Sequence, residues 1–305
     1  GDLFAIVWDP KTQQLYGYNG SGRSPEGRDL DALLSAIEAM KSGGQLPKDY
    51  RGIPSHGSLA VTVPGTVDGW FALHERWGAL DMDEVLAPAA EYAEIGFPMS
   101  PVIAAAFAAN QRRFEQRESM IEELDNARAL YFPEGVAPAV GTMFRNPDLA
   151  KTLRILGAEG RASFYQGRLA EQMADYFEAI DADLTAADLA NHVGEWVEPR
   201  GVDYHGVTLW ELPPNGQGFA ALMMLNIIKQ ADVAEMERGS AELFHLMVEA
   251  KRLAFEAMAQ TFADPLFAQI PVDQLLSDEF AAAQYARISK DKVLTAEALA
   301  VPLEG

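Results

Sequence analysis

The first residues of the chain have the apolar and turn pattern of a β-hairpin. Leu3–Trp8 form an apolar run, turn residues follow, and Gln13–Asn19 continues with bulky side chains. The glycine-flanked stretch GSGRSP then occupies 20–25, and apolar residues recur at helical spacing over Leu30–Met40. The pattern therefore predicts that Arg23 lies on a loop between a strand and a helix.

Helical spacing dominates the next part of the chain. We expect helices over Thr66–Trp77, Met82–Ile95, 101–126, Asp148–Leu156 and Ala162–Ile180. Before the first of these, Ser58–Val63 is β-like and predicts a short strand, which Pro64 and Gly65 end. Tyr131–Met143 is rich in proline and glycine and predicts a loop.

Strand patterns return between Trp196 and Leu212, and further helices are expected after them. These helices cover Phe219–Ile228, Ala241–Phe262, Ser277–Ile288 and Ala296–Val301. In the long helix, a stripe of apolar residues predicts one buried face: Leu243, Met247, Ala250, Ala254, Met258 and Phe262. No fixed repeat or low-complexity linker occurs, so one intertwined α/β domain is preferred to two separable ones.

Composition narrows the class of protein and its partners. Of the 305 residues, 49% are hydrophobic and 23% are charged, which is typical of a folded globular chain. The formal charge of -21 repels phosphate backbones, so we expect no nucleic-acid partner. The absence of cysteine excludes disulfides, thiolate nucleophiles and cysteine-based metal sites. No run of about 18 uninterrupted apolar residues occurs, so we expect no membrane span.

Most common catalytic motifs are absent. The Gly20–Gly22 loop lacks the further glycine of a dinucleotide fingerprint, and no Walker-type Gly-Lys-Ser/Thr occurs. The five histidines, at 56, 74, 192, 205 and 245, have no metal-ligand spacing, so we expect neither metal nor cofactor. Ser58, in His-Gly-Ser, is the nearest imitation of a serine nucleophile, but no Gly-x-Ser-x-Gly elbow surrounds it. No catalytic nucleophile is therefore predicted in this chain.

Arg23 is the best candidate for a residue that touches a ligand. Its guanidinium offers a planar fork of donors that fits a carboxylate through two parallel hydrogen bonds. The flanking glycines allow a ligand to approach the loop closely. The alternative is an ordinary loop arginine paired with Glu26 or Asp29.

Several stretches, in matching order over most of the chain, resemble the large subunit of the γ-glutamyltransferase (γ-glutamyltranspeptidase) family. In the first third they are GDLFAIVWDPKTQQLYGYNGSGRSP, LAVTVPGTVDGWFALHERWGAL and EVLAPAAEYAEIGFPMS. Further along they are ASFYQGRLAEQMADYF, DLANHVGEWVEPRGVDYHGVTLWELPPNGQG and ELFHLMVEAKRLAFEAMAQTFADP. The Val-Pro-Gly-Thr-Val-x-Gly and Pro-Pro-x-x-x-Gly elements are specific in combination.

The resemblance implies a helix-rich α/β (α+β) fold, the αββα four-layer sandwich of N-terminal-nucleophile (Ntn) hydrolases. Residues 1–305 would be a single large-subunit portion, completed by a separate small subunit after the precursor cuts itself. The nucleophile would be the threonine that begins that small subunit. In the family, an arginine at the position of Arg23 binds the α-carboxylate of the γ-glutamyl substrate. Further association of such two-chain units is possible, and a segment before Gly1 is expected.

The resemblance leaves several alternatives open. Around Arg23 the chain has Gly-Arg-Ser-Pro instead of the Phe-Arg-Glu-x-Ala-Pro of well-known bacterial transferases. A glutaryl- or cephalosporin-type acylase is therefore one alternative, and a non-catalytic carboxylate-binding or scaffold homologue is another. Pro213–Gly218 could form a subunit contact or pocket wall, or a simple strand-to-helix turn. A periplasmic or secreted location and a cytoplasmic one, in a bacterium, both stay open.

Overall fold

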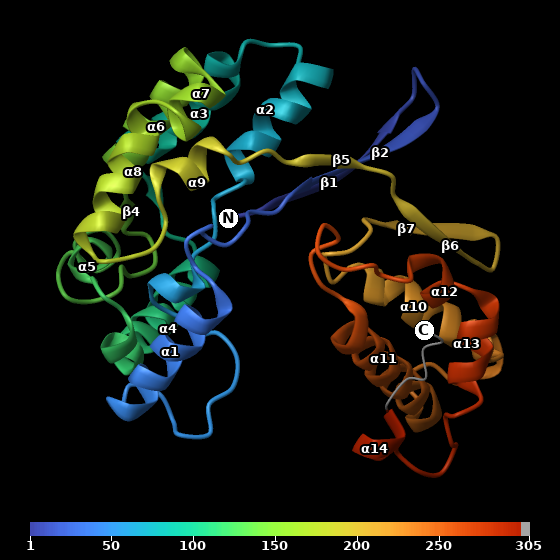
Figure 1. Cartoon of the computed structure of the whole chain (residues 1–305). Helices are drawn as coiled ribbons and strands as arrows, with labels where there is room; N and C mark the ends of the chain where they lie inside the picture. The colour runs from blue at the N-terminus through green and yellow to red at the C-terminus, as the bar shows by residue number, and fades with distance from the viewer. Residues whose placement is uncertain (300–305) are drawn as a thin grey trace. The chain divides into compact units, whose positions relative to one another are not determined.

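The computed structural model describes residues 1–299, which form two compact units (Figure 1). Unit 1 consists of Gly1–Leu3 and Gly20–Gly194, and unit 2 of Phe4–Asn19 and the chain from Glu195 onward. The chain thus leaves unit 2 after a strand and returns to it after all of unit 1 is complete. We predicted that residues 1–305 are one portion of a domain that a separate small subunit completes. This stays a prediction.

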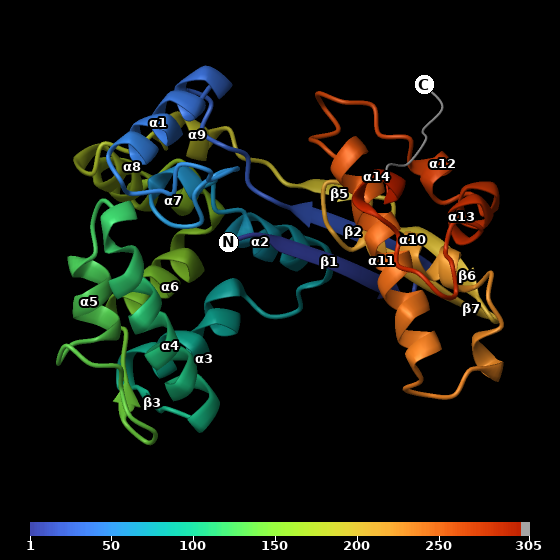
Figure 2. The same ribbon diagram turned by 90° about the horizontal axis from the view of Figure 1, so that it is seen from below.

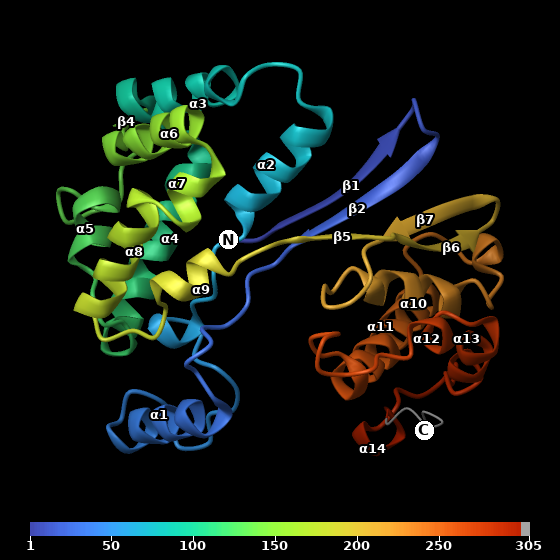
Figure 3. The same cartoon turned by 45° about the horizontal axis from the view of Figure 1, so that its top comes forward.

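Unit 2 contains a three-stranded sheet. It contains β1 (Leu3–Asp9), β2 (Gln14–Gly20) and β5 (Glu195–Val197), in the order β1-β2-β5. β5 runs antiparallel to β2 and pairs Asn19 with Glu195, and Figures 1 and 3 both show the two strands side by side. The predicted hairpin is confirmed. Among the strands of residues 1–299, β1 has β2 as its one neighbour in this sheet and so forms one of its edges.

The remainder of unit 2 places helices against a second hairpin. β6 (Arg200–Tyr204) and β7 (Val207–Glu211) pair antiparallel around His205 and Gly206, whose φ angles of 47° and 87° are those of a tight hairpin turn. α10 (Phe219–Ile228) packs on both strands and on α11 (Ala241–Thr261), as Figure 2 shows from below. The smaller elements are η3 (Val233–Glu235), α12 (Val272–Leu275), α13 (Asp278–Tyr285) and α14 (Ala296–Leu299).

The buried face of α11 differs in part from the predicted stripe. Ala250, Ala254 and Met258 are buried as expected, but Met247 is 41% exposed. The buried face turns instead through Leu246, Glu249, Leu253 and Ala257. The other predicted helices of this unit are confirmed within a few residues. The last of them was expected to reach Val301, which lies outside the described residues.

Unit 1 is mainly helical. Its helices are α1 (Leu30–Ser42), η1 (Ser58–Ala60), α2 (Thr66–Trp77), α3 (Met82–Ile95), α4 (Pro101–Arg117), η2 (Glu118–Met120), α5 (Asp125–Tyr131), α6 (Pro147–Glu159), α7 (Arg161–Tyr165), α8 (Arg168–Ala179) and α9 (Ala186–Ala190). Two short strands, β3 (Phe97–Pro98) and β4 (Met143–Phe144), pair antiparallel. The α3–α6 pair forms the centre of its core, with Leu86, Leu153 and Leu156 buried. Within residues 1–299, no helix has the length and apolar composition needed to cross a membrane.

The strand predicted over Ser58–Val63 is wrong, because side chains satisfy its main-chain groups. The Glu122 carboxylate accepts hydrogen bonds from the Ser58 N–H at 2.9 Å and the Ser58 hydroxyl at 2.8 Å. Arg28 donates to the Leu59 carbonyl at 2.8 Å and the Ser58 carbonyl at 3.2 Å. With these partners, Ser58–Ala60 forms a single 3-10 turn and needs no neighbouring strand.

Two long predicted helices are divided in the structure. The helix expected over 101–126 ends at Arg117, and α5 is a separate helix. The helix expected over Ala162–Ile180 is interrupted at Gln166 and Gly167, where α7 ends and α8 begins. Gly167, at the N-cap of α8, has φ -110° and ψ -156°, an extended conformation that breaks the helical path.

Candidate functional site

Arg23 lies on the loop between β2 and α1, as predicted, and its side chain is exposed. The main chain around it is held by unit 1. The Arg23 carbonyl accepts a hydrogen bond from the Val63 N–H at 2.9 Å, and the Gly22 N–H donates to the Asp2 carboxylate at 3.0 Å. The loop therefore presents an exposed, charged side chain on a backbone that hydrogen bonds hold in place.

Two glycines allow this loop to lie directly on the segment Val63–Thr66. A Cβ atom on Gly22 would lie 1.5 Å from the Val63 carbonyl oxygen, and one on Gly65 would lie 2.0 Å from the Gly20 carbonyl oxygen. Both distances are far below a van der Waals contact, so only glycine fits while the main chains lie this close. The Val-Pro-Gly-Thr element thus positions the Arg23 loop through main-chain contact.

A buried polar cluster lies at the start of α2. Asp68 is 4% exposed and accepts hydrogen bonds from the Arg161 guanidinium and from the Gly194 N–H, the latter at 2.8 Å. The Tyr165 hydroxyl accepts from the Asp68 N–H at 3.0 Å and donates to the Pro64 carbonyl at 2.7 Å. A second guanidinium nitrogen of Arg161 donates to the His192 carbonyl at 2.5 Å.

Burial controls the protonation of two side chains in this cluster. It lowers the pKa of His192; Asp68 opposes this shift, Arg161 adds to it, and weaker effects of Asp2 and Arg23 oppose each other. Among the described residues the buried His192 Nε2 atom has no hydrogen-bond partner, and it lies 3.9 Å from an Asp68 carboxylate oxygen. Burial likewise raises the pKa of Tyr165 well above its usual range. A neutral imidazole and a neutral phenol therefore surround the Asp68–Arg161 ion pair.

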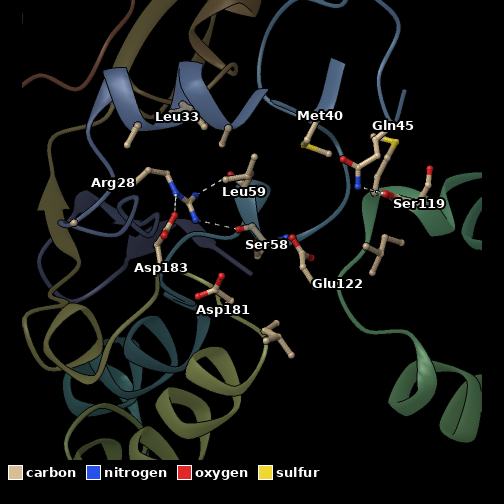
Figure 4. A pocket seen from close by; sticks show the side chains of 16 residues that line it. Arg28, Leu33, Met40, Gln45, Ser58, Leu59, Ser119, Glu122, Asp181 and Asp183 are labelled. Atoms are coloured by element: carbon tan, nitrogen blue, oxygen red, sulfur yellow. Dashed lines mark hydrogen bonds and ion pairs between the residues drawn. The ribbon is translucent and has the colours of Figure 1, made fainter. Parts of the chain in front are cut away.

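Unit 1 also contains a pocket of about 410 Å³, shown in Figure 4. Arg28 lies at its wall with a side chain only 6% exposed, and donates to the Asp183 carboxylate at 2.6 Å and to the carbonyls described above. All three guanidinium nitrogens bind oxygens of the chain itself. Arg28 is therefore a structural residue.

Ser58, the nearest imitation of a serine nucleophile, lines the same pocket. Its hydroxyl donates to the Glu122 carboxylate, which accepts from the Ser58 N–H as well. The neighbouring His56 pairs with the Ser55 hydroxyl at 2.9 Å instead. Because the Ser58 hydroxyl is bound to a carboxylate and the neighbouring His56 to Ser55, these residues do not form the Ser-His-Asp geometry that serine hydrolysis needs.

The other candidate residues have identifiable structural contacts. The Glu26 N–H donates to Asp188 at 2.7 Å, and the Asp29 carboxylate caps α1 by accepting the Ala32 N–H at 2.7 Å. Pro213–Gly218 connects β7 to α10 directly, as a strand-to-helix turn. Within residues 1–299 no group of three or more metal-binding side chains occurs.

Sequence reasoning predicted the loop position of Arg23 but missed the buried cluster. Asp68 and Tyr165 are 97 residues apart along the chain, and Asp68 and Arg161 are 93 apart. No motif spacing connects positions so distant. The only local signal was a single aspartate in the first turn of a helix, which is commonly explained by the helix dipole alone.

Comparison with known proteins assigns the family. The family model described as Gamma-glutamyltranspeptidase matches residues 1–303. The "Glutathione hydrolase-like YwrD proenzyme" of Bacillus subtilis (strain 168) is 35% identical over 92% of this chain and 50% of its own length. The "Oxamate amidohydrolase proenzyme" of Klebsiella pneumoniae is 34% identical over 84% of this chain and 48% of its own. The chain spans about half the length of the curated relatives it matches.

Solved structures give the same result. A cephalosporin acylase from Bacillus halodurans is 36% identical with a TM-score of 0.81, and the match covers 94% of this chain and 51% of that one. The γ-glutamyltranspeptidase of Helicobacter pylori is 26% identical with a TM-score of 0.86, over 99% of this chain and 82% of that one. The predicted fold class, a helix-rich α/β fold of the Ntn-hydrolase type, is confirmed. From the family model and these relatives together, the chain belongs to the γ-glutamyltranspeptidase family.

Proposed function

We propose that this chain is the large subunit of a two-chain enzyme that cleaves γ-glutamyl amide bonds such as that of glutathione. The observation that carries the proposal is Arg23, whose charged side chain is exposed while its backbone is fixed by Val63 and Asp2. A guanidinium held in this way can bind the α-carboxylate of a γ-glutamyl group through two hydrogen bonds. The names of the glutathione hydrolase relatives support the same substrate class.

The chemistry would need a nucleophile from a second chain. In the proposed reaction, the hydroxyl of a threonine at the start of the small subunit attacks the γ-carbonyl carbon. The amine leaves with a proton, and the γ-glutamyl group stays as an ester on the threonine. Water or an acceptor amine then takes the acyl group and restores the hydroxyl.

Exposed apolar side chains on unit 2 support the proposal of a second chain. Phe4, Ile6 and Trp8 alternate along β1 and lie on one face, with exposures of 50%, 37% and 53%. Large apolar side chains grouped on a sheet face usually pack against another protein surface. The word proenzyme in the relatives' names, and the chain's match to about half of their length, support processing into two chains.

Replacing Arg23 tests the substrate assignment. In the full-length protein, we expect Arg23→Ala to raise KM for a γ-glutamyl anilide about 30- to 1,000-fold, equal to about 2–4 kcal/mol, because the substrate carboxylate loses its charged partner. Arg23→Lys should give an intermediate KM, since it keeps the charge but loses the planar fork. Arg51→Ala, which removes an exposed arginine elsewhere in unit 1, is the matched control. An unchanged KM in folded Arg23→Ala would remove Arg23 from the site.

An acylase of the glutaryl or cephalosporin type is the second candidate. The cephalosporin acylase and the oxamate amidohydrolase have about the same sequence identity to this chain as the glutathione hydrolase-like protein of Bacillus subtilis. In that case Arg23 would bind a glutaryl-type carboxylate instead. Hydrolysis rates of a γ-glutamyl anilide and a glutaryl anilide should be compared on the same preparation. Turnover of the glutaryl compound alone would favour the acylase. Mass spectrometry should detect a second chain that begins with threonine in either case.

A further inference from the structure

The Tyr165 hydroxyl joins two parts of the segment on which the Arg23 loop lies. Tyr165 is 0% exposed, and its hydroxyl donates to the Pro64 carbonyl at 2.7 Å and accepts from the Asp68 N–H at 3.0 Å. The N-cap residue of α2 is Gly65, which has no side chain to accept the free N–H groups of the first turn. A side chain from α7 therefore caps α2 and fixes the residue before the cap.

The same segment fixes the backbone of the Arg23 loop through main-chain contacts. Pro64 lies between Val63, whose N–H binds the Arg23 carbonyl at 2.9 Å, and Gly65, which lies against Gly20. A movement of the Pro64 peptide would therefore move both contacts of the loop. A guanidinium must be placed within a few tenths of an ångström to make two hydrogen bonds to one carboxylate.

From this geometry we infer that Tyr165 is a positioning residue for Arg23. Its hydroxyl holds Val63–Gly65 in the one position that lets Arg23 bind the substrate carboxylate. The inference rests on the proposed role of Arg23 in carboxylate binding. Tyr165 itself, fully buried, touches no substrate.

The variant Tyr165→Phe isolates the hydroxyl. The ring would keep its contacts with Arg161, whose guanidinium carbon lies 4.5 Å from the ring centre, and with His192, whose ring centre is 5.2 Å away. The matched control is Tyr176→Phe in the same unit, where the lost hydroxyl donates to the Glu123 carboxylate at 2.8 Å. Both variants lose one hydrogen-bonded phenol hydroxyl, on a buried side chain in Tyr165 and on an exposed one in Tyr176, but of the two only Tyr165 binds the segment Val63–Gly65.

The kinetic test uses the full-length protein and a γ-glutamyl anilide. We expect Tyr165→Phe to raise KM about 3- to 10-fold, the loss of one or two hydrogen bonds, with kcat changed less than about twofold. Tyr176→Phe should match the unchanged protein. In an Arg23→Ala background, the further effect of Tyr165→Phe on KM should disappear, because there is no longer a guanidinium to place. An equal effect in both backgrounds, or no effect in either, would overturn the inference.

Hydrogen exchange gives a readout that does not depend on activity. We expect the Val63 N–H, which binds the Arg23 carbonyl, to exchange faster in Tyr165→Phe and at an unchanged rate in Tyr176→Phe. If Arg23→Ala leaves KM unchanged, the proposed function fails, and this exchange rate alone decides whether Tyr165 holds the loop. If Arg23→Ala raises KM but Tyr165→Phe changes neither KM nor exchange, only the positioning role fails. If Tyr165→Phe does not fold, Gly22→Ala is the second variant. Its added Cβ would push the Arg23 loop away from Val63, and we expect it to raise KM in the same way.

Discussion

His192 differs from every other histidine of the described chain in being buried beside an ion pair. Its pKa is lowered by burial first, with Asp68 and Asp2 acting against the shift and Arg161 and Arg23 acting with it. The unfolded chain has an ordinary histidine pKa of about 6.5. Below that pH the unfolded state takes up the proton more readily than the folded state, so protonation favours unfolding.

We therefore expect stability to fall as the pH drops below about 6.5 and to keep falling until the lowered pKa of folded His192 is passed. His192→Gln removes the titrating group, so its urea midpoint should change less between pH 7 and pH 5.5 than that of the unchanged protein. His205→Asn, in an exposed hairpin turn, is the control and should keep the original pH dependence. Identical pH dependence in His192→Gln would show that other groups control stability in this range.

At the scale of single residues, the loop position of Arg23 could be predicted, but the contacts that hold its loop in place could not. The cues for Arg23 were local, since the glycines and the serine lie beside it in the sequence. The role of Tyr165 depends on a hydroxyl reaching a carbonyl 101 residues earlier in the chain. Side-chain contacts of that kind form only when helices pack, and nothing in the pattern of apolar positions encodes them.

Glu249 shows how one helix can hold a loop that has no secondary structure. Its carboxylate, on the buried face of α11, accepts from the Leu294 N–H at 2.9 Å and from Arg252 at 2.6 Å. Arg252 in turn donates to the Leu294 carbonyl at 2.7 Å. The two side chains thus bind both main-chain groups of Leu294, as a neighbouring strand would.

Glu249→Gln should lower the free energy of unfolding by about 1–3 kcal/mol, because an amide cannot accept both hydrogen bonds as a carboxylate does and Arg252 loses its charged partner. Urea denaturation followed by circular dichroism measures this change. Glu256→Gln removes the same charge from the same helix, where the carboxylate binds Gln260 at a half-buried position, and should cost about 0.5 kcal/mol or less. Equal losses in the two variants would contradict the special role of Glu249.

At the scale of elements, predictions succeeded where the chain itself marks the ends. Thr66–Trp77 follows Pro-Gly and precedes Gly78, and Met82–Ile95 precedes Gly96; both helices have the predicted bounds. Ser58–Val63 failed because Arg28 and Glu122 satisfy its main-chain groups from elsewhere. The buried position of Glu249 could not be predicted either, because a charged residue would not be assigned to a buried helix face from sequence.

The acidity of the whole chain should make its stability depend on salt. With a formal charge of -21, folding brings many like charges close together, and added ions screen their repulsion. We expect the melting temperature to rise by a few degrees between about 0.02 and 0.3 M NaCl, with KCl acting alike. Differential scanning fluorimetry measures the shift. A melting temperature that falls with salt would mean that attractive ion pairs outweigh the repulsion.

At the scale of the molecule, the two interleaved units were beyond the reach of local patterns. Most of the longer helices follow from their own stretch of sequence, but the sequence of each stretch does not show which other stretches share its core. Tyr18 pairs with Trp196, and their rings meet edge to face at 4.9 Å. Both residues belong to unit 2, and in the sequence they flank the main segment of unit 1, Gly20–Gly194. The pattern of apolar residues indicated an α/β chain, and only the resemblance to a known family indicated the Ntn-hydrolase fold.

The pairing of β2 with β5 also sets an order of events during synthesis. Asn19 and its partner Glu195 are about 175 residues apart, and all of unit 1 after Gly20 is encoded between them. At about 5 to 20 residues per second, a ribosome needs on the order of 10 to 35 s to cover that distance. During this interval β2 has left the exit tunnel with one edge unpaired, while unit 1 can already fold. The first strands made are thus among the last to be completed, and a chaperone that protects strand edges would find its target there.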